Sequence, residues 1–208
     1  MLKKILRTFI IVLGISMLTA CNDHRKVSFS SPDTRQKLRA ENPWPDNSFI
    51  VLAYHDVEDE SADQRFMAVR TSALREQFSW LRENGYHPIS VEQIRAAHRG
   101  EITLPAKAVL LSFDDGYQSF YTRVFPLLKA YQWPALWAPV GSWVDTPANK
   151  KVKFGDEYID REKIATWQQI AELARSPLVE IGAHTWNSHY GVQANPSGSK
   201  LPAIANRF

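Results

Sequence analysis

Four short, mainly apolar runs that alternate with amphipathic segments constrain this fold more than any other feature of the sequence. The runs cover residues 48–55, 107–116, 134–141 and 178–186. A strand with little polar alternation is typical of a parallel sheet that is buried on both faces. Strands that alternate with helices predict crossover connections between parallel strands. We therefore expect an α/β fold.

The amphipathic segments predict helices within residues 72–86, 87–100, 119–133 and 166–177, where apolar residues recur at helical spacing. Ser90 and Thr166 precede two of these segments and are the expected N-caps, because their hydroxyls can accept hydrogen bonds from free backbone N–H groups. Pro126 lies inside the third segment and predicts a kink there.

Two adjacent carboxylates, Asp114 and Asp115, end the second run, and Gly116 permits a sharp turn after them. In parallel α/β folds the chemistry lies at the carboxyl ends of the strands. Capping of the next helix explains either aspartate taken alone, but two in succession are more than a cap requires. Because successive strand residues point to opposite sides, the two carboxylates can have different roles.

The fourth run ends in the sequence HTWNSH, which places His184 and His189 around a turn. A structural histidine bonded to a neighbour is one interpretation of each. A divalent metal site is the other, since two imidazoles and one carboxylate leave a coordination position open to water. Such a site lowers the pKa of bound water toward ~7, and the second carboxylate can then act as a general base. The ligand set suits zinc, and also ferrous iron, cobalt or nickel.

Three segments together resemble motifs of the polysaccharide deacetylases, the NodB-like domains of carbohydrate esterase family 4. They are SFDDG at 112–116, PALWAPVGSWV at 134–144 and EIGAHTWNSH at 180–189. The resemblance implies an α/β fold built as a (β/α) barrel, usually of seven strands. It also implies metal-dependent removal of acetyl groups from sugar amides.

The same resemblance assigns roles to particular residues. Asp114 is the expected general base, and the expected metal ligands are Asp115, His184 and His189. His55, at the end of the first run, is the expected general acid that protonates the leaving amine, and a core histidine is the alternative. Two aromatic residues near the motifs, Tyr117 and Trp186, are expected either to stack on a sugar or to pack in the protein.

The histidines of the last motif are five residues apart here, whereas the family usually places them four apart. This spacing and LAYHDV at 52–57 resemble the branch that de-N-acetylates poly-β-1,6-N-acetyl-D-glucosamine during biofilm polysaccharide export. An N-acetylglucosamine polymer is then the expected substrate, with a polysaccharide export porin as a partner. Two alternatives stay open: a deacetylase of peptidoglycan or chitin-like oligomers, and an inactive glycan-binding lipoprotein.

The N-terminus resembles that of a bacterial lipoprotein. Residues 1–20 combine a basic start with a short apolar stretch, as in a signal peptide, and LTAC predicts lipidation of Cys21. The polar composition of residues 21–45 predicts a tether. We expect a membrane anchor through Cys21 at the periplasmic face of the outer membrane. Loss of the signal would leave 22 basic and 22 acidic residues, so the charge gives no argument for nucleic-acid binding.

The deacetylase domain is expected in residues 46–208. After His189 the sequence is rich in Asn, Pro, Ser and Gly, and the later motifs of the family have no counterpart. Four strands are too few to close a barrel. We therefore expect an incomplete barrel that corresponds to the N-terminal part of the domain, with its C-terminal part missing.

Overall fold

The computed structural model describes residues 31, 33, 34, 37 and 43–204. The chain divides into two compact units, Met1–Pro43 and Trp44–Phe208. The predicted signal peptide and Cys21 lie outside the described residues, as does most of the predicted tether. Among the residues that are described, no helix is both long and apolar enough to span a bilayer. The account below concerns the second unit.

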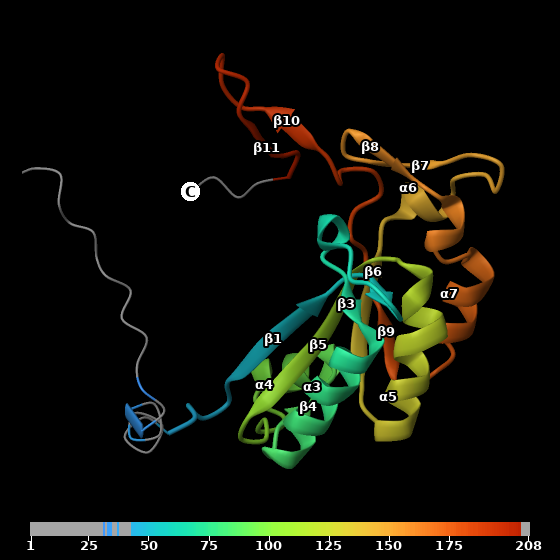
Figure 1. The fold of residues 1–208 in the computed structure, drawn as a ribbon. Coiled ribbons are helices and arrows are strands. Elements are labelled where there is room, and N and C mark those ends of the chain that lie inside the picture. The colour runs from blue at the N-terminus through green and yellow to red at the C-terminus, as the bar shows by residue number, and fades with distance from the viewer. Residues whose placement is uncertain (1–30, 32, 35–36, 38–42, 205–208) are drawn as a thin grey trace, which may run out of the picture. The chain divides into compact units, whose positions relative to one another are not determined.

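The main sheet is parallel throughout and runs in the order β1-β5-β6-β9, with β4 also paired to β5 (Figure 1). Its strands are β1 (Phe49–Tyr54), β4 (His87–Pro88), β5 (Ala108–Asp115), β6 (Ala135–Pro139) and β9 (Val179–Ile181). All four predicted strands form, and β4 is an addition that the sequence did not indicate. The predicted α/β architecture with parallel strands is confirmed.

Helices connect these strands close to the predicted positions. They are α3 (Thr71–Glu83), α4 (Val91–His98), α5 (Phe125–Tyr131) and α7 (Trp167–Leu173). The short helix α6 (Gly141–Val144) was not predicted. Ser90 and Thr166 cap α4 and α7 as predicted, each within a reciprocal capping box. Near Pro126 a π-helical turn, η2 (Phe120–Val124), passes directly into α5. The irregularity expected there is consistent with the N–H that proline lacks.

The core lies on both faces of the sheet, as the uninterrupted apolar strands require. Val109, Leu111 and Phe113 alternate along β5 and pack in a large cluster with residues of α3, α5 and α7. Ala108 belongs instead to a smaller cluster with residues around α4. Because strand side chains alternate between faces, α4 covers the face opposite to α3 and α5.

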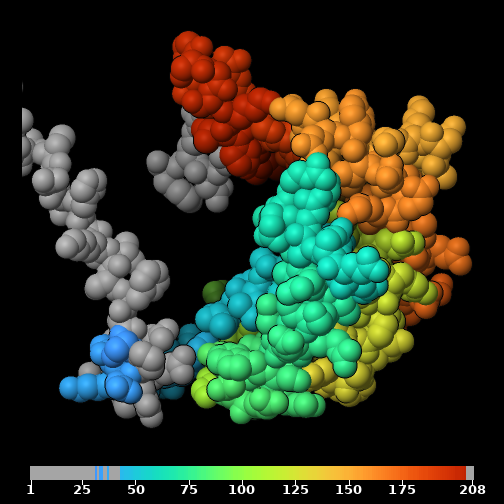
Figure 2. All heavy atoms as spheres, viewed as in Figure 1, coloured from blue at the N-terminus to red at the C-terminus, as the bar shows by residue number. Residues whose placement is uncertain are grey.

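Three short strand pairs complete the unit. They are β2 (Val57–Glu58) with β3 (Val69–Arg70), β7 (Val152–Phe154) with β8 (Glu157–Ile159), and β10 (Gly191–Gln193) with β11 (Lys200–Pro202). Of two 3-10 turns, η1 (Gln64–Phe66) lies between β2 and β3, and η3 (Arg161–Lys163) lies between β8 and α7. Figure 2 shows the β10–β11 region in red beside the orange β7–β8 region. Both pairs gather beyond the carboxyl ends of the main strands.

Candidate active site

The end of β5 buries a carboxylate that has no hydrogen-bond donor. Asp115 is fully buried, and neither of its side-chain oxygens has a hydrogen-bond partner. Its backbone is left-handed, with φ 73°, and Gly116 follows with φ 92°. A Cβ on Gly116 would lie 2.6 Å from the Cβ of Pro139, so only glycine fits this turn. The predicted sharp turn is therefore present, and it aims Asp115 inward.

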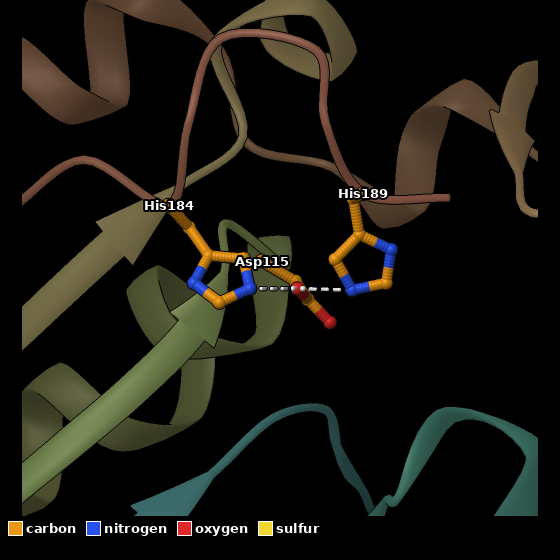
Figure 3. A group of neighbouring side chains, drawn as sticks. All are labelled: Asp115, His184 and His189. Atoms are coloured by element: carbon orange, nitrogen blue, oxygen red, sulfur yellow. Dashed lines mark ion pairs between the residues drawn. The ribbon is translucent and has the colours of Figure 1, made fainter. Parts of the chain in front are cut away.

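The loop after β9 brings two histidines to this carboxylate. Nε2 of His184 lies 3.5 Å from Asp115 Oδ1, and Nε2 of His189 lies 3.2 Å from the same oxygen. Figure 3 shows both imidazoles reaching the carboxylate from opposite ends of the loop. The loop turns at Thr185, whose backbone is left-handed with φ 67° and whose hydroxyl accepts a hydrogen bond from Ser188 N. The three predicted ligands therefore meet at one point.

The donor set fits a divalent cation. One ligand atom from each of Asp115, His184 and His189 lies within 4.8 Å of the others. A buried carboxylate without donors is costly, and a cation bound between it and two imidazoles would remove that cost. Two histidines and one carboxylate are ligands that zinc accepts in hydrolases. The group therefore meets the chemical requirements of a catalytic metal centre.

Two aromatic side chains fix the position of the His189 ring. Trp143 on α6 lies 4.8 Å from it edge-on, and Phe154 on β7 lies 5.2 Å from it, measured between ring centroids. The contact with Asp115 raises the pKa of His189, while burial opposes that rise. Sequence reasoning missed Trp143 and Phe154, because α6 and β7, which carry them, are too short for a periodicity to indicate.

The two residues predicted as base and acid end neighbouring strands. Asp114 is half-buried and accepts a hydrogen bond from Ser112 Oγ at 3.1 Å. His55 is half-buried and directly follows β1. Since Tyr54 of β1 pairs with Phe113 of β5, the parallel register brings His55 level with Asp114. The structure therefore places both residues at the edge of the sheet that also carries Asp115.

Asp56, the residue after His55, has a structural role that the sequence did not indicate. Asp56 is buried, and its Oδ1 accepts hydrogen bonds from Val57 N at 2.8 Å and Ser119 Oγ at 2.7 Å. Its Oδ2 lies 3.3 Å from Lys163 Nζ. These contacts join the end of β1 to the segment after β5 and to η3. Asp56 therefore fixes the position of the backbone next to His55.

The two aromatic residues expected near the substrate have different surroundings. Tyr117 is completely buried in the large core cluster, and burial raises the pKa of its hydroxyl. Its suggested role as a stacking platform is wrong, because no face of the ring is open to a sugar, and its packing alternative holds. Trp186 is 60% exposed and lies against Gly141, where a Cβ would be 2.3 Å from the indole. Stacking by Trp186 stays a prediction.

Comparison with known proteins agrees with this geometry. Residues 101–200 match the family model for polysaccharide deacetylase. This part of the chain belongs to the polysaccharide deacetylase family. The resemblance inferred from the SFDDG and EIGAHTWNSH motifs is thereby confirmed.

Individual relatives point the same way. The chain is 65% identical over 207 residues to a poly-β-1,6-N-acetyl-D-glucosamine N-deacetylase of Escherichia coli strain K12. That match covers 100% of this chain and 31% of the relative, so the chain spans about a third of the length of that relative.

Two solved structures are similar to this fold. A de-N-acetylase from Aggregatibacter actinomycetemcomitans is 45% identical, with a TM-score of 0.68 over 74% of this chain and 61% of that one. The deacetylase domain of BpsB from Bordetella bronchiseptica is 42% identical, with a TM-score of 0.66 over 77% of this chain and 64% of that one.

Proposed function

We propose that this chain carries the catalytic centre of a metal-dependent N-deacetylase that acts on poly-β-1,6-N-acetyl-D-glucosamine. The observation that carries the proposal is the convergence of Asp115, His184 and His189 on one point, around a buried carboxylate that lacks hydrogen-bond donors. The 65% identity to an N-deacetylase of that polymer supports the choice of substrate.

Asp115, His184 and His189 would hold the divalent cation, with zinc, iron, cobalt or nickel as suitable ions. The chemistry that such an ion supplies is polarisation of the acetamide carbonyl and activation of water near neutral pH. The aromatic rings of Trp143 and Phe154 restrict the rotation of His189, so the ligand geometry is preorganised.

Asp114 and His55 divide the proton transfers between them. Asp114 accepts the proton of the attacking water as its oxygen bonds to the carbonyl carbon. His55, in its protonated form, donates a proton to the amide nitrogen as the C–N bond breaks. Acetate leaves, and a free amine remains on the sugar. The level placement of the two residues at the ends of β5 and β1 supports this division.

The wider setting belongs to the same proposal. The LTAC sequence and Cys21 support a lipid anchor at the periplasmic face of the outer membrane, where an export porin would be the partner in biofilm polysaccharide export. The five-stranded sheet would form part of a (β/α) barrel of about seven strands, with β1 and β9 as the ends that further strands continue. Labelling with palmitate tests the anchor. The label should be lost in Cys21→Ser, and an unchanged label would contradict the anchor.

Acetate release tests the enzymatic proposal. The metal-loaded chain should release acetate from oligomers of β-1,6-linked N-acetylglucosamine, and Asp114→Asn should not. Zinc binding by both proteins is the control that the site is intact. Equal release by the two proteins would refute the role of Asp114. No release by the zinc-loaded wild type would refute the activity of this chain.

A further inference from the structure

A cleft opens directly from the histidine side of the candidate metal centre. It has a volume of about 620 Å³ and lies between Phe154 at the end of β7 and the β10–β11 hairpin. His184 and His189 form part of its lining, so the cleft and the metal centre share two walls. We call it the hairpin cleft. In Figure 1 the red hairpin β10–β11 projects past the ends of the main strands.

One rim of the hairpin cleft is apolar and exposed. Tyr190 is 49% exposed, Leu201 is 41% exposed and Ile204 is 62% exposed. Large exposed apolar side chains that gather around a concavity mark a binding surface. Tyr190 directly follows the candidate ligand His189, so this rim begins beside the reacting centre.

The hairpin cleft has little charge. Among the described residues that line it, Lys200 is the only lysine, arginine, aspartate or glutamate. Its ammonium forms an ion pair with Asp156, at the turn between β7 and β8. That pair also ties the two hairpins together, and a hydrogen bond from Ala203 N to Tyr190 O extends the β10–β11 ladder to the rim. The walls are thus held in place and present no unpaired carboxylate or ammonium group.

These features fit an uncharged sugar. The C–H face of a pyranose ring is apolar and packs on aromatic and aliphatic side chains, while its hydroxyls remain at the open edge. A second apolar groove exists between β1 and α3, but it shares no residue with the metal centre. The hairpin cleft alone of these two can hold a sugar that is bonded to the one undergoing reaction.

We infer that the hairpin cleft binds the acetylated sugar units adjacent to the unit being deacetylated, with Tyr190 and Leu201 as the contacts that recognise them. This inference rests on the proposed function. The protein would then recognise several adjacent uncharged sugar units of the polymer rather than a single sugar. Polymer recognition would then begin one residue after the metal ligand in sequence.

The test is binding of a fully acetylated β-1,6-linked N-acetylglucosamine pentamer, measured by calorimetry on the zinc-loaded chain. All proteins carry Asp114→Asn, which prevents turnover during the measurement. Tyr190→Ala should weaken binding about tenfold, and Leu201→Gln should weaken it severalfold, because each removes apolar contact with the sugar. Tyr190→Phe keeps the ring and should bind like the parent.

The matched control is Tyr158→Ala. Tyr158 is 63% exposed on β8 and does not line the cleft, so its loss should leave the pentamer affinity unchanged. Zinc affinity, measured on every variant, reports whether the metal centre is intact. Parent-like pentamer binding by both Tyr190→Ala and Leu201→Gln would overturn the inference. So would an equal loss in Tyr158→Ala, or no binding by the parent.

Acetate release by the chain with Asp114 intact separates this inference from the proposed function. If the pentamer binds through Tyr190 but no acetate is released, the inference stands and the activity fails. If acetate is released while Tyr190→Ala and Leu201→Gln leave pentamer binding unchanged, the activity stands and the inference fails.

Discussion

Two buried aspartates lie at the ends of the neighbouring strands β1 and β5, and their surroundings are opposite. Asp56 has three protein donors, from Val57, Ser119 and Lys163. Asp115 has no hydrogen-bond donor and faces two imidazole nitrogens. A carboxylate with a full set of protein donors holds structure together, whereas one without donors is suited to a cation. The difference distinguishes Asp56, a structural residue, from Asp115, a candidate metal ligand, although both side chains are buried.

The largest expected effect comes from removing the carboxylate that lacks donors. Asp115→Asn should lower acetate release about 10³-fold or more, because a metal centre supplies several kcal/mol of transition-state stabilisation. At a pH above the raised pKa of His189, where the imidazole is neutral, the metal-free variant should be at least as stable as the metal-free wild type, since it no longer buries a charge without a hydrogen-bond donor. Kinetics and urea unfolding with chelator present measure the two quantities. A large loss of metal-free stability would show that Asp115 is structural.

Replacement of Asp56 should have the opposite effect, a loss of stability without a loss of zinc binding. Asp56→Ala should lower the free energy of unfolding by about 3 kcal/mol, because it leaves the buried Ser119 hydroxyl without its acceptor and removes one carboxylate partner of Lys163. Zinc affinity of the folded variant should change little. Asp59→Ala is the control, since Asp59 forms an exposed pair with Arg123 that should contribute little. Equal unfolding midpoints for Asp56→Ala and the wild type would remove the distinction between the two aspartates.

The turn that aims Asp115 can be tested separately. Gly116→Ala should destabilise the fold by about 2–3 kcal/mol, from a strained positive φ and a 2.6 Å approach to Pro139. Gly155→Ala is the matched variant, because Gly155 also has positive φ, 57°, but has no neighbour within 4 Å. It should cost only about 1 kcal/mol. Thermal unfolding of the two variants compares them, and equal costs would show that Pro139 does not confine the turn.

The smallest effect is expected at the aromatic contacts of His189. Phe154→Leu should weaken zinc binding about tenfold, because the imidazole gains rotational freedom. Phe49→Leu is the control, since Phe49 is an exposed phenylalanine on β1 and is absent from the ring contacts of His189. Competition with a chromogenic chelator measures the affinities. Zinc affinities that match in the wild type and Phe154→Leu would show that Asp115 alone orients the histidine.

The sequence predicted the features that follow from the periodicity of apolar residues and from the positions of the strand ends. Apolar runs located β1, β5, β6 and β9, and the meeting of parallel strand ends anticipated that Asp115 would lie near His184 and His189. Hydroxyls before helical segments located both capped helices. These features are local, or follow from a topology rule, so a single sequence contains them.

Features that depend on distant partners were not predictable. Tyr117 is in the core partly because it bridges to Ile164, and nothing near residue 117 indicates that contact. The aromatic neighbours of His189 come from α6 and β7, which are too short to have a readable period. The role of Asp56 as an acceptor depends on Ser119 and Lys163, which are distant in the sequence.

Metal titration of the stripped protein tests the central claim most directly. Acetate release from N-acetylglucosamine oligomers is measured after chelation and then during addition of zinc, for the wild type and for His189→Ala. The account predicts that chelation abolishes release, that about one equivalent of zinc restores it in the wild type, and that His189→Ala stays inactive at that level. Release that survives chelation, or full restoration of His189→Ala by one equivalent, would contradict a metal centre built from Asp115, His184 and His189.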